Sequence, residues 1–343
     1  MKITIEERVL HFKQPAGTSR GVHTERRIWL LHMTEDGRTG VGECAPLPQL
    51  SCDDRADYID LLRRFCDEVE RTGEIPYEAL RDYPSMLFGL ETALRSLQFS
   101  HLSPLTSHLL FDTPFSRGEE GIPINGLVWM GSFDEMSRRI EQKLEQGFRC
   151  VKLKIGAIDF DAELELVKQI RSRFGRNDVE LRVDANGAFS YEEALYKLEL
   201  LSQYALHSIE QPIKARQWAW MSELCRESPL PIALDEELIG VNDPDQKRQM
   251  LNIIRPRYII LKPSLHGGMA GCREWIDIAR SMQIGTWITS ALESNIGLNA
   301  IAQFAAEVYG PHIKMPQGLG TGQLFTDNIE MPLEIHGDKL WMV

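Results

Sequence analysis

From about residue 122 onward, short apolar segments alternate with longer segments in which apolar residues recur every three or four positions. The short segments have the length and composition of strands, and the longer ones those of amphipathic helices. The predicted strands are 122–129, 148–155, 179–184, 206–210, 231–235, 258–262, 285–290 and 312–318. The predicted helices are 133–146, 160–174, 191–203, 215–226, 244–252, 269–282 and 295–308. This regular alternation predicts an α/β fold of the (β/α)8-barrel type.

The residues before this repeat have a different pattern. Apolar and polar positions alternate first near the N-terminus and again in 27–33 and 39–44, which predicts three antiparallel strands. Helical periodicity follows. The polar stretch Gln14–Thr24 is expected to be a loop, either a flexible hairpin connection between the first two strands or a lid. We therefore predict an α+β domain over 1–115 and the barrel over 116–322. The weakly alternating segment 323–343 is expected to return to the first domain.

Composition narrows the functional classes. The chain has 343 residues and a formal net charge of -12, which argues against broad binding to nucleic acid or to an anionic membrane surface. No stretch approaches the ~20 apolar residues of a membrane span, and the N-terminus has no apolar signal core. The six cysteines are scattered and form no CxxC motif, which is typical of a cytoplasmic protein. We expect a small-molecule ligand; the sequence does not indicate an oligomeric state.

Three carboxylates stand at the carboxyl ends of successive predicted strands. They are Asp184, Glu210 and Asp235, and such ends converge on one face of a parallel barrel. A strand with lysines at 152 and 154 precedes them, and a strand ending in Lys262 follows. Because side chains alternate along a strand, both lysines of the first strand are expected to point into the barrel. Each acid alone also fits a turn, and the whole set also fits a salt-bridge layer that closes the barrel.

This set of residues suits one kind of chemistry. Three neighbouring carboxylates repel one another unless a cation holds them, and oxygen ligands of this type suit Mg²⁺. A dication beside a lysine suits removal of a proton next to a substrate carboxylate. A lysine base must be uncharged, and the like charge of Lys152 is expected to help lower the pKa of Lys154.

Five short motifs carry a resemblance to a known family. They are Lys152-Leu-Lys154, Asp184-Ala-Asn186, Ile209-Glu-Gln-Pro212, Leu234-Asp-Glu236 and Leu261-Lys-Pro-Ser264. Together they resemble the enolase superfamily, within it the muconate-lactonizing-enzyme-like group, whose members carry an α+β capping domain before the barrel. The resemblance implies that Asp184, Glu210 and Asp235 bind Mg²⁺. It also implies that Lys154 and Lys262 flank the substrate carbon on opposite faces.

Within that group the chain most resembles the o-succinylbenzoate synthase family. The segments that carry this are Ile124–Trp129, Ser290–Ser294 and Gly318–Gly322. That family dehydrates 2-succinyl-6-hydroxy-2,4-cyclohexadiene-1-carboxylate to 2-succinylbenzoate in menaquinone biosynthesis. The resemblance implies that Lys154 removes the proton next to the carboxylate and then protonates the departing hydroxyl. Lys262 would remain a cation on the other face.

Further residues are candidates for binding the substrate, Lys152 among them. Asn186 is a candidate to hold a metal ligand in place or to contact the substrate carboxylate, and it also fits a simple turn residue. Ser290 fits a carboxylate contact or a helix cap. Gly320, between two other glycines, is expected to bring backbone N–H groups to a carboxylate. Arg20, in the predicted loop, is a candidate to meet a carboxylate from above. Glu236 follows a predicted ligand and is expected to point the other way, which leaves open both support of a metal ligand from behind and a simple surface pairing.

Related activities use the same residues. N-acylamino acid racemases and dipeptide epimerases also place one lysine on each face, and muconate cycloisomerases share the acids. Dipeptide epimerases usually carry an Asp-x-Asp after the eighth strand, where this chain reads Gln317-Gly-Leu-Gly-Thr-Gly322 without an acid. A barrel that only binds a ligand and catalyses no reaction would be expected to lack one of the three metal-binding acids or one of the two lysines. All five residues are present here.

Overall fold

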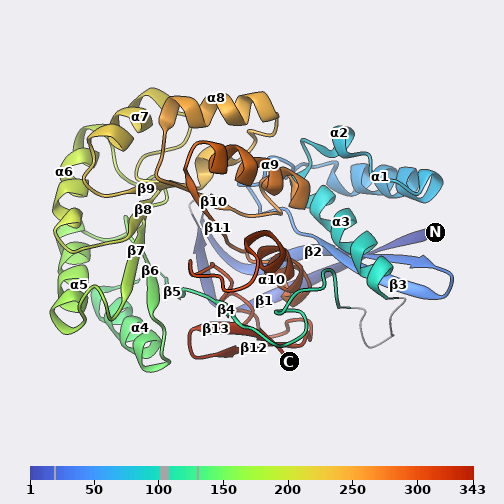
Figure 1. The fold of residues 1–343 in the computed structure, drawn as a ribbon, viewed down its shortest axis with the longest axis horizontal. Coiled ribbons are helices and arrows are strands. Elements are labelled where there is room, and N and C mark those ends of the chain that lie inside the picture. The colour runs from blue at the N-terminus through green and yellow to red at the C-terminus, as the bar shows by residue number, and fades with distance from the viewer. Residues whose placement is uncertain (19–20, 101–107, 130) are drawn as a thin grey trace.

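The computed structural model describes residues 1–18, 21–100, 108–129 and 131–343. An N-terminal α+β domain lies beside a parallel α/β barrel, and Figure 1 shows them on opposite sides of the molecule. The strands of the N-terminal domain are β1 (Lys2–Thr18), β2 (Gly21–Glu35) and β3 (Arg38–Cys44). Its helices are α1 (Tyr58–Thr72), α2 (Tyr77–Leu80) and α3 (Pro84–Phe99). The three strands form an antiparallel sheet in chain order.

The prediction that Gln14–Thr24 is an irregular loop is wrong. Within the described residues it is mostly strand, because β1 and β2 continue as a hairpin in which Ala16 pairs with His23 and Gly17 with Val22. The register shifts between His11 and Ala16. The hairpin arms are largely exposed, so their sequence is polar and lacks the alternation that marks a half-buried strand.

Helix α3 lies directly on strand β3. A Cβ atom at Gly42 would lie 2.0 Å from the carbonyl oxygen of Gly89, and one at Gly40 would lie 2.2 Å from the amide nitrogen of Leu97. These glycines therefore permit a backbone-to-backbone approach that fixes the helix on the sheet.

The barrel sheet has seven parallel strands among the described residues, in the order β11-β10-β9-β8-β7-β6-β5. The strands are β5 (Gly126–Val128), β6 (Cys150–Lys154), β7 (Glu180–Asp184), β8 (Ser208–Glu210), β9 (Ile232–Leu234), β10 (Tyr258–Leu261) and β11 (Gly285–Ile288). The helices around them are α4 (Phe133–Glu145), α5 (Phe160–Arg173), α6 (Tyr191–Ser202), α7 (Trp218–Glu227), α8 (Pro244–Ile254), α9 (Gly268–Ser281) and α10 (Asn295–Tyr309). A short 3₁₀ helix spans Glu236–Leu238.

The predicted eighth strand is reduced to two single-residue bridges that complete the ring. Gln317 bridges to Ile124 and Gly318 to Thr289, both in parallel orientation. Pro316 has no N–H group to extend the ladder further back. The barrel prediction is thus confirmed, with its last strand shorter than expected.

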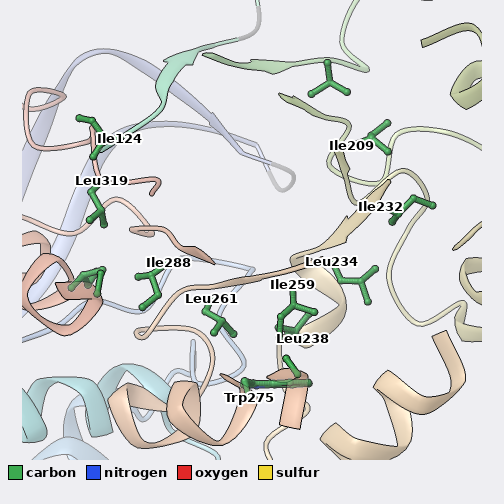
Figure 2. Close-up of a cluster of buried hydrophobic side chains, with 14 of the residues drawn as sticks. Ile124, Ile209, Ile232, Leu234, Leu238, Ile259, Leu261, Trp275, Ile288 and Leu319 are labelled. Carbon is green, nitrogen blue, oxygen red and sulfur yellow. The ribbon is translucent and has the colours of Figure 1, made fainter. Parts of the chain in front are cut away.

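Alternation along the strands separates two sets of side chains. Figure 2 shows Ile209, Leu234, Ile259 and Leu261 on the outside of the strands, in the same apolar cluster as Trp275 of α9. This confirms the prediction that Ile209, Ile259 and Leu261 face the helices. The residues between them in sequence point into the barrel.

The C-terminal segment contacts both parts of the chain. Strands β12 (Leu333–His336) and β13 (Lys339–Met342) pair with each other, and β13 pairs with β4 (Ile122–Pro123) at the entrance to the barrel. Upstream, Phe325 bridges to Phe12 of β1. The limits of the two domains remain predictions. No described helix is both long and apolar enough to cross a bilayer.

Candidate active site

The predicted charged residues meet at the carboxyl ends of the barrel strands. Lys154 and Asp184 stand in register on β6 and β7, and Asp184 and Glu210 stand in register on β7 and β8. Asp235 follows β9 directly, and Lys262 follows β10. The three acids therefore occupy adjacent strands with a lysine on each side, as the sequence predicted.

Lysine ammonium groups lie on one oxygen of each carboxylate. Lys152 Nζ lies 2.8 Å from Glu210 Oε2 and 3.2 Å from Asp184 Oδ2. Lys154 Nζ lies 2.6 Å from Asp184 Oδ2, and Lys262 Nζ pairs with Asp235 Oδ2. The three acids and both lysines of β6 are buried, whereas the side chain of Lys262 is 13% exposed. Both lysines of β6 thus point into the barrel, and Lys152 binds two of the acids.

Burial and these pairs shift the pKa values in opposite directions. Burial alone would raise the pKa of Asp184, but the ammonium groups of Lys154 and Lys152 hold it well below its usual range. Burial and the charge of Asp184 raise the pKa of Glu210 to about 8, and burial raises that of Asp235. Burial would lower the pKa of Lys152, but the carboxylates of Glu210 and Asp184 outweigh it and raise that pKa. Lys152 is therefore a fixed cation.

The carboxylates fit a hard divalent cation. Glu210 Oε1 and Asp235 Oδ1 are buried and have no hydrogen-bond partner, although buried oxygens are normally paired. Three carboxylates on adjacent strands offer the oxygen ligands that Mg²⁺ prefers. Among the described residues no group of three His, Cys, Asp or Glu side chains already stands as a metal cluster. In this structure the ammonium groups of the three lysines neutralise part of the charge of the carboxylates.

Asn186 links two of the charged residues. Its side-chain oxygen accepts from Lys154 Nζ at 2.8 Å, and its side-chain nitrogen donates to Glu236 Oε1 at 2.9 Å. Glu236 lines the pocket, so the expectation that it points away from Asp235 is wrong. The reason is that β9 ends at Leu234 and the chain turns into a 3₁₀ helix, where strand alternation no longer applies.

A pocket opens above these residues. It is lined by Lys152, Lys154 and Lys262 at its floor and by residues of both domains at its walls. Ser290 and Gly320 also line it, whereas Arg20 lies outside the described residues. The Ser290 hydroxyl bonds to Thr321 Oγ1 at 2.5 Å. Ser290 does not cap α10, because that role belongs to Ser294.

Several pocket residues were not predicted as site residues. Asn125, Trp129, Thr289 and Thr321 line the pocket, and the hydroxyl oxygen of Thr289 is buried without a partner. The signal for Thr289 was its position at the carboxyl end of a barrel strand, next to Ser290. The N–H groups of Gly320 and Thr321 find no acceptor in the described part of the chain. Groups without a partner in the described part of the chain therefore belong to three residues that line the pocket.

Comparisons with known proteins bear on this arrangement. Residues 135–337 match the family described as "Enolase C-terminal domain-like", and residues 18–97 match "MenC, N-terminal domain". The o-succinylbenzoate synthase of Desulfotalea psychrophila is 47% identical over 99% of this chain and 98% of its own length. The chain belongs to the o-succinylbenzoate synthase family of the enolase superfamily.

Solved structures agree with this membership. The crystal structure of MenC from Desulfotalea psychrophila LSv54 covers 99% of each chain with a TM-score of 0.82 and 42% identity. A dipeptide epimerase from Enterococcus faecalis, solved with Mg and the dipeptide L-Leu-L-Tyr, has a TM-score of 0.84 at 19% identity, covering 100% of this chain and 96% of its own. The backbone alone therefore does not distinguish the synthase family from the epimerase.

Proposed function

We propose that this chain catalyses the Mg²⁺-dependent dehydration of 2-succinyl-6-hydroxy-2,4-cyclohexadiene-1-carboxylate to 2-succinylbenzoate, a step of menaquinone biosynthesis. This is the reaction of its family, and an enzyme of this class is a hydro-lyase. The observation that carries the proposal is the placement of Lys154 and Lys262 on opposite sides of three adjacent carboxylates, in one pocket. The cytoplasmic location also remains a prediction, supported by six cysteines that are all unpaired.

We assign the metal-binding role to Asp184, Glu210 and Asp235. Bound there, Mg²⁺ would neutralise the acids, attract the substrate carboxylate and stabilise the negative charge that proton removal creates. The unpartnered oxygens of Glu210 and Asp235 support this assignment. Lys152, which touches both Asp184 and Glu210, would hold those two carboxylates in place as a permanent cation.

Lys154 is the proposed base. Its uncharged amine would take the proton from the ring carbon that bears the carboxylate. The same nitrogen would then return that proton to the hydroxyl group as the carbon–oxygen bond breaks, so that water leaves and the ring becomes aromatic. Asn186, whose side-chain oxygen lies 2.8 Å from Lys154 Nζ, would hold the amine in place through both steps.

Lys262 is proposed to act from the opposite side of the site. Burial alone would lower its pKa, but the carboxylates of Asp235 and Glu210 outweigh burial and raise that pKa, which keeps the group charged. A fixed cation at this position would stabilise the negative charge on the substrate. The unused N–H groups of Gly320 and Thr321, with the Ser290 and Thr289 hydroxyls, would receive the second carboxylate of the substrate.

The test follows loss of the diene absorbance with Mg²⁺ present, beside Lys154→Ala and a chelator control. We expect rapid turnover by the wild type and a loss of at least ~10³-fold in the variant and in the chelated sample. The matched control is Lys168→Ala, since Lys168 is exposed and pairs with Glu165 at the surface. No turnover by folded, Mg²⁺-loaded wild type would refute the proposal. Exchange of the α-proton of N-succinyl amino acids or dipeptides would then be measured to identify a related activity.

A further inference from the structure

A buried arginine lies where the N-terminal domain meets the barrel. Arg26 on β2 is 2% exposed, whereas the side chain of its neighbour Arg27 is 56% exposed. The Arg26 guanidinium forms no direct ion pair with any described residue; it donates to three backbone carbonyl oxygens instead. Nε donates to Leu292 at 3.2 Å, Nη2 donates to Ala45 at 2.5 Å, and Nη1 donates to Pro46. One side chain thus connects a loop of the N-terminal domain with a loop of the barrel.

Both loops carry apolar residues of the pocket. Leu47 follows the two N-terminal carbonyls that Arg26 binds, and Leu292 bears the third. Both leucines line the pocket and belong to one buried apolar cluster. Arg26 itself does not line the pocket, so it can affect a substrate only through these loops.

The barrel loop is held in a conformation that its residue does not favour. Leu292 has a φ of 64°, in the left-handed region that costs a non-glycine residue ~1–3 kcal/mol. Arg26 holds its carbonyl, and the carboxylate of Glu293 holds the preceding residue by accepting from the Ala291 N–H at 2.6 Å. The hydroxyl of Ser264, two residues after Lys262, donates to the same carboxylate. The strained conformation of Leu292 is therefore held by hydrogen bonds from residues that do not line the pocket.

The surroundings explain why a cation is tolerated here. Burial lowers the pKa of Arg26, and the nearby carboxylates of Glu293 and Glu43 oppose that effect. Glu43 in turn accepts from the N–H of Ser294 at 2.9 Å and from that of Gly297, at the start of α10. Because a planar guanidinium has donors in fixed directions, it can reach carbonyls of two loops at once, which a lysine ammonium cannot reproduce.

We propose that Arg26 is a positioning residue for substrate binding, which sets the separation of Leu47 and Leu292 and so the shape of the apolar wall of the pocket. This inference rests on the proposed function, because the wall is the surface that would meet the ring of the substrate. The two leucines have no group that can donate or accept a proton or bind a metal, so the wall would contribute to binding and not to the chemical step. Loss of Arg26 should therefore weaken binding in the ground state and the transition state alike, and raise KM more than it lowers kcat.

The experiment compares Arg26→Met with Arg27→Met as a matched control in the Mg²⁺-loaded enzyme. For Arg26→Met we expect KM to rise ~10-fold and kcat to fall less than ~3-fold, with Mg²⁺ affinity unchanged. Arg27→Met should match the wild type. An unchanged KM in a folded Arg26→Met variant would overturn the proposal, and so would a fall in kcat without a rise in KM. If this variant does not fold, Arg26→Lys, which keeps the charge, is tested by the same criteria.

A double-mutant cycle with Leu47→Ala separates positioning from general loosening of the fold. If Arg26 acts through the wall, the rise in KM caused by Arg26→Met should be much smaller when Leu47 is already removed. Independent, multiplicative effects on KM would contradict the proposal. Failure of the wild type to turn over the substrate would instead refute the proposed function, and with it the role of Arg26, so the two failures are distinguishable.

Discussion

Buried charged groups have their partners at the amino end of the barrel interior, whereas some lack a partner at the carboxyl end. Strand β7 has a buried charged residue toward each end. Arg182, near its start, has each side of its guanidinium occupied: it pairs with Glu180 at 2.7 Å, donates to Pro316 and lies 4.5 Å from the Trp287 ring centroid. Asp184, two residues later, belongs to a group in which two carboxylates, Glu210 and Asp235, each keep a buried oxygen without a partner. Satisfied charge stabilises a fold, whereas unsatisfied charge marks a place for a ligand.

The aromatic residues reinforce this contrast. At the amino end, His207 stacks on Tyr258 with ring centroids 4.8 Å apart, and Trp287 packs beside both rings. At the carboxyl end the pocket reaches the lysines, and within the described residues no comparable cluster of stacked aromatic rings fills it. If this difference between the two ends holds, substitutions at the carboxyl end should change activity, and substitutions at the amino end should change stability.

Glu210→Gln should have the largest effect. We expect kcat/KM to fall by at least ~10³-fold and Mg²⁺ affinity to fall at least ~10-fold, because the amide cannot replace a charged oxygen ligand. Without metal, the variant should be at least as stable as the wild type, since a neutral group replaces a carboxyl that is costly to bury. Kinetics, Mg²⁺ titration and thermal unfolding with a chelator measure these three quantities. Glu165→Gln, at an exposed pair, is the control. Lower metal-free stability would contradict the comparison.

Trp287→Leu tests the amino end. Trp287 is 2% exposed, and its loss should reduce the free energy of unfolding by ~3 kcal/mol through a cavity and the lost contact with Arg182. Denaturant unfolding measures this loss. At a temperature where the variant is folded, KM and kcat should stay within about threefold of the wild type. A large loss of activity in the folded variant would show that the two ends are not independent.

Asp53→Asn tests the comparison at an unpartnered carboxylate oxygen of a residue that does not line the pocket. Asp53 Oδ2 accepts from the Ser85 N–H and hydroxyl, while Oδ1 has no partner, and burial raises the pKa of the group to about 6. The folded protein therefore binds the proton more tightly than the unfolded chain, so the stability contributed by this group falls as pH rises from about 4 to above 6.

Relative to Asp53→Asn, the wild type should accordingly lose ~2–3 kcal/mol of unfolding free energy over this pH range. Denaturant unfolding of both proteins at several pH values measures the difference. Asp277→Asn, at an exposed position, should leave the pH dependence of the wild type unchanged. A constant difference between the wild type and Asp53→Asn would refute the expectation.

Thr289→Val should give the smallest effect. The hydroxyl of Thr289 has no partner and lies in the pocket wall, so its loss should raise KM about fivefold, equivalent to one modest hydrogen bond. Three residues earlier, in β11, Thr286 bonds instead to the Tyr309 hydroxyl at 2.9 Å, near the amino end. Thr286→Val should therefore reduce stability by ~1 kcal/mol and leave KM unchanged. The reverse pattern in steady-state kinetics and unfolding would count against the comparison.

The sequence by itself determined the barrel and the floor of the site. Strand alternation placed Lys152 and Lys154 inside, and the common position of Asp184, Glu210 and Asp235 at strand ends brought them together, because parallel strands of a closed barrel share one face. These are local periodicities, which a sequence records directly.

Only the tertiary structure decided the walls. Glu236 turns toward the pocket because β9 ends at Leu234, and the hydroxyl of Thr289 is buried without a partner, which its sequence neighbours do not reveal. The contact of Arg26 with the Leu292 carbonyl joins residues 266 positions apart, and no local pattern encodes it. Hydrogen bonds between distant segments depend on how whole elements pack, so they are read only from the folded chain.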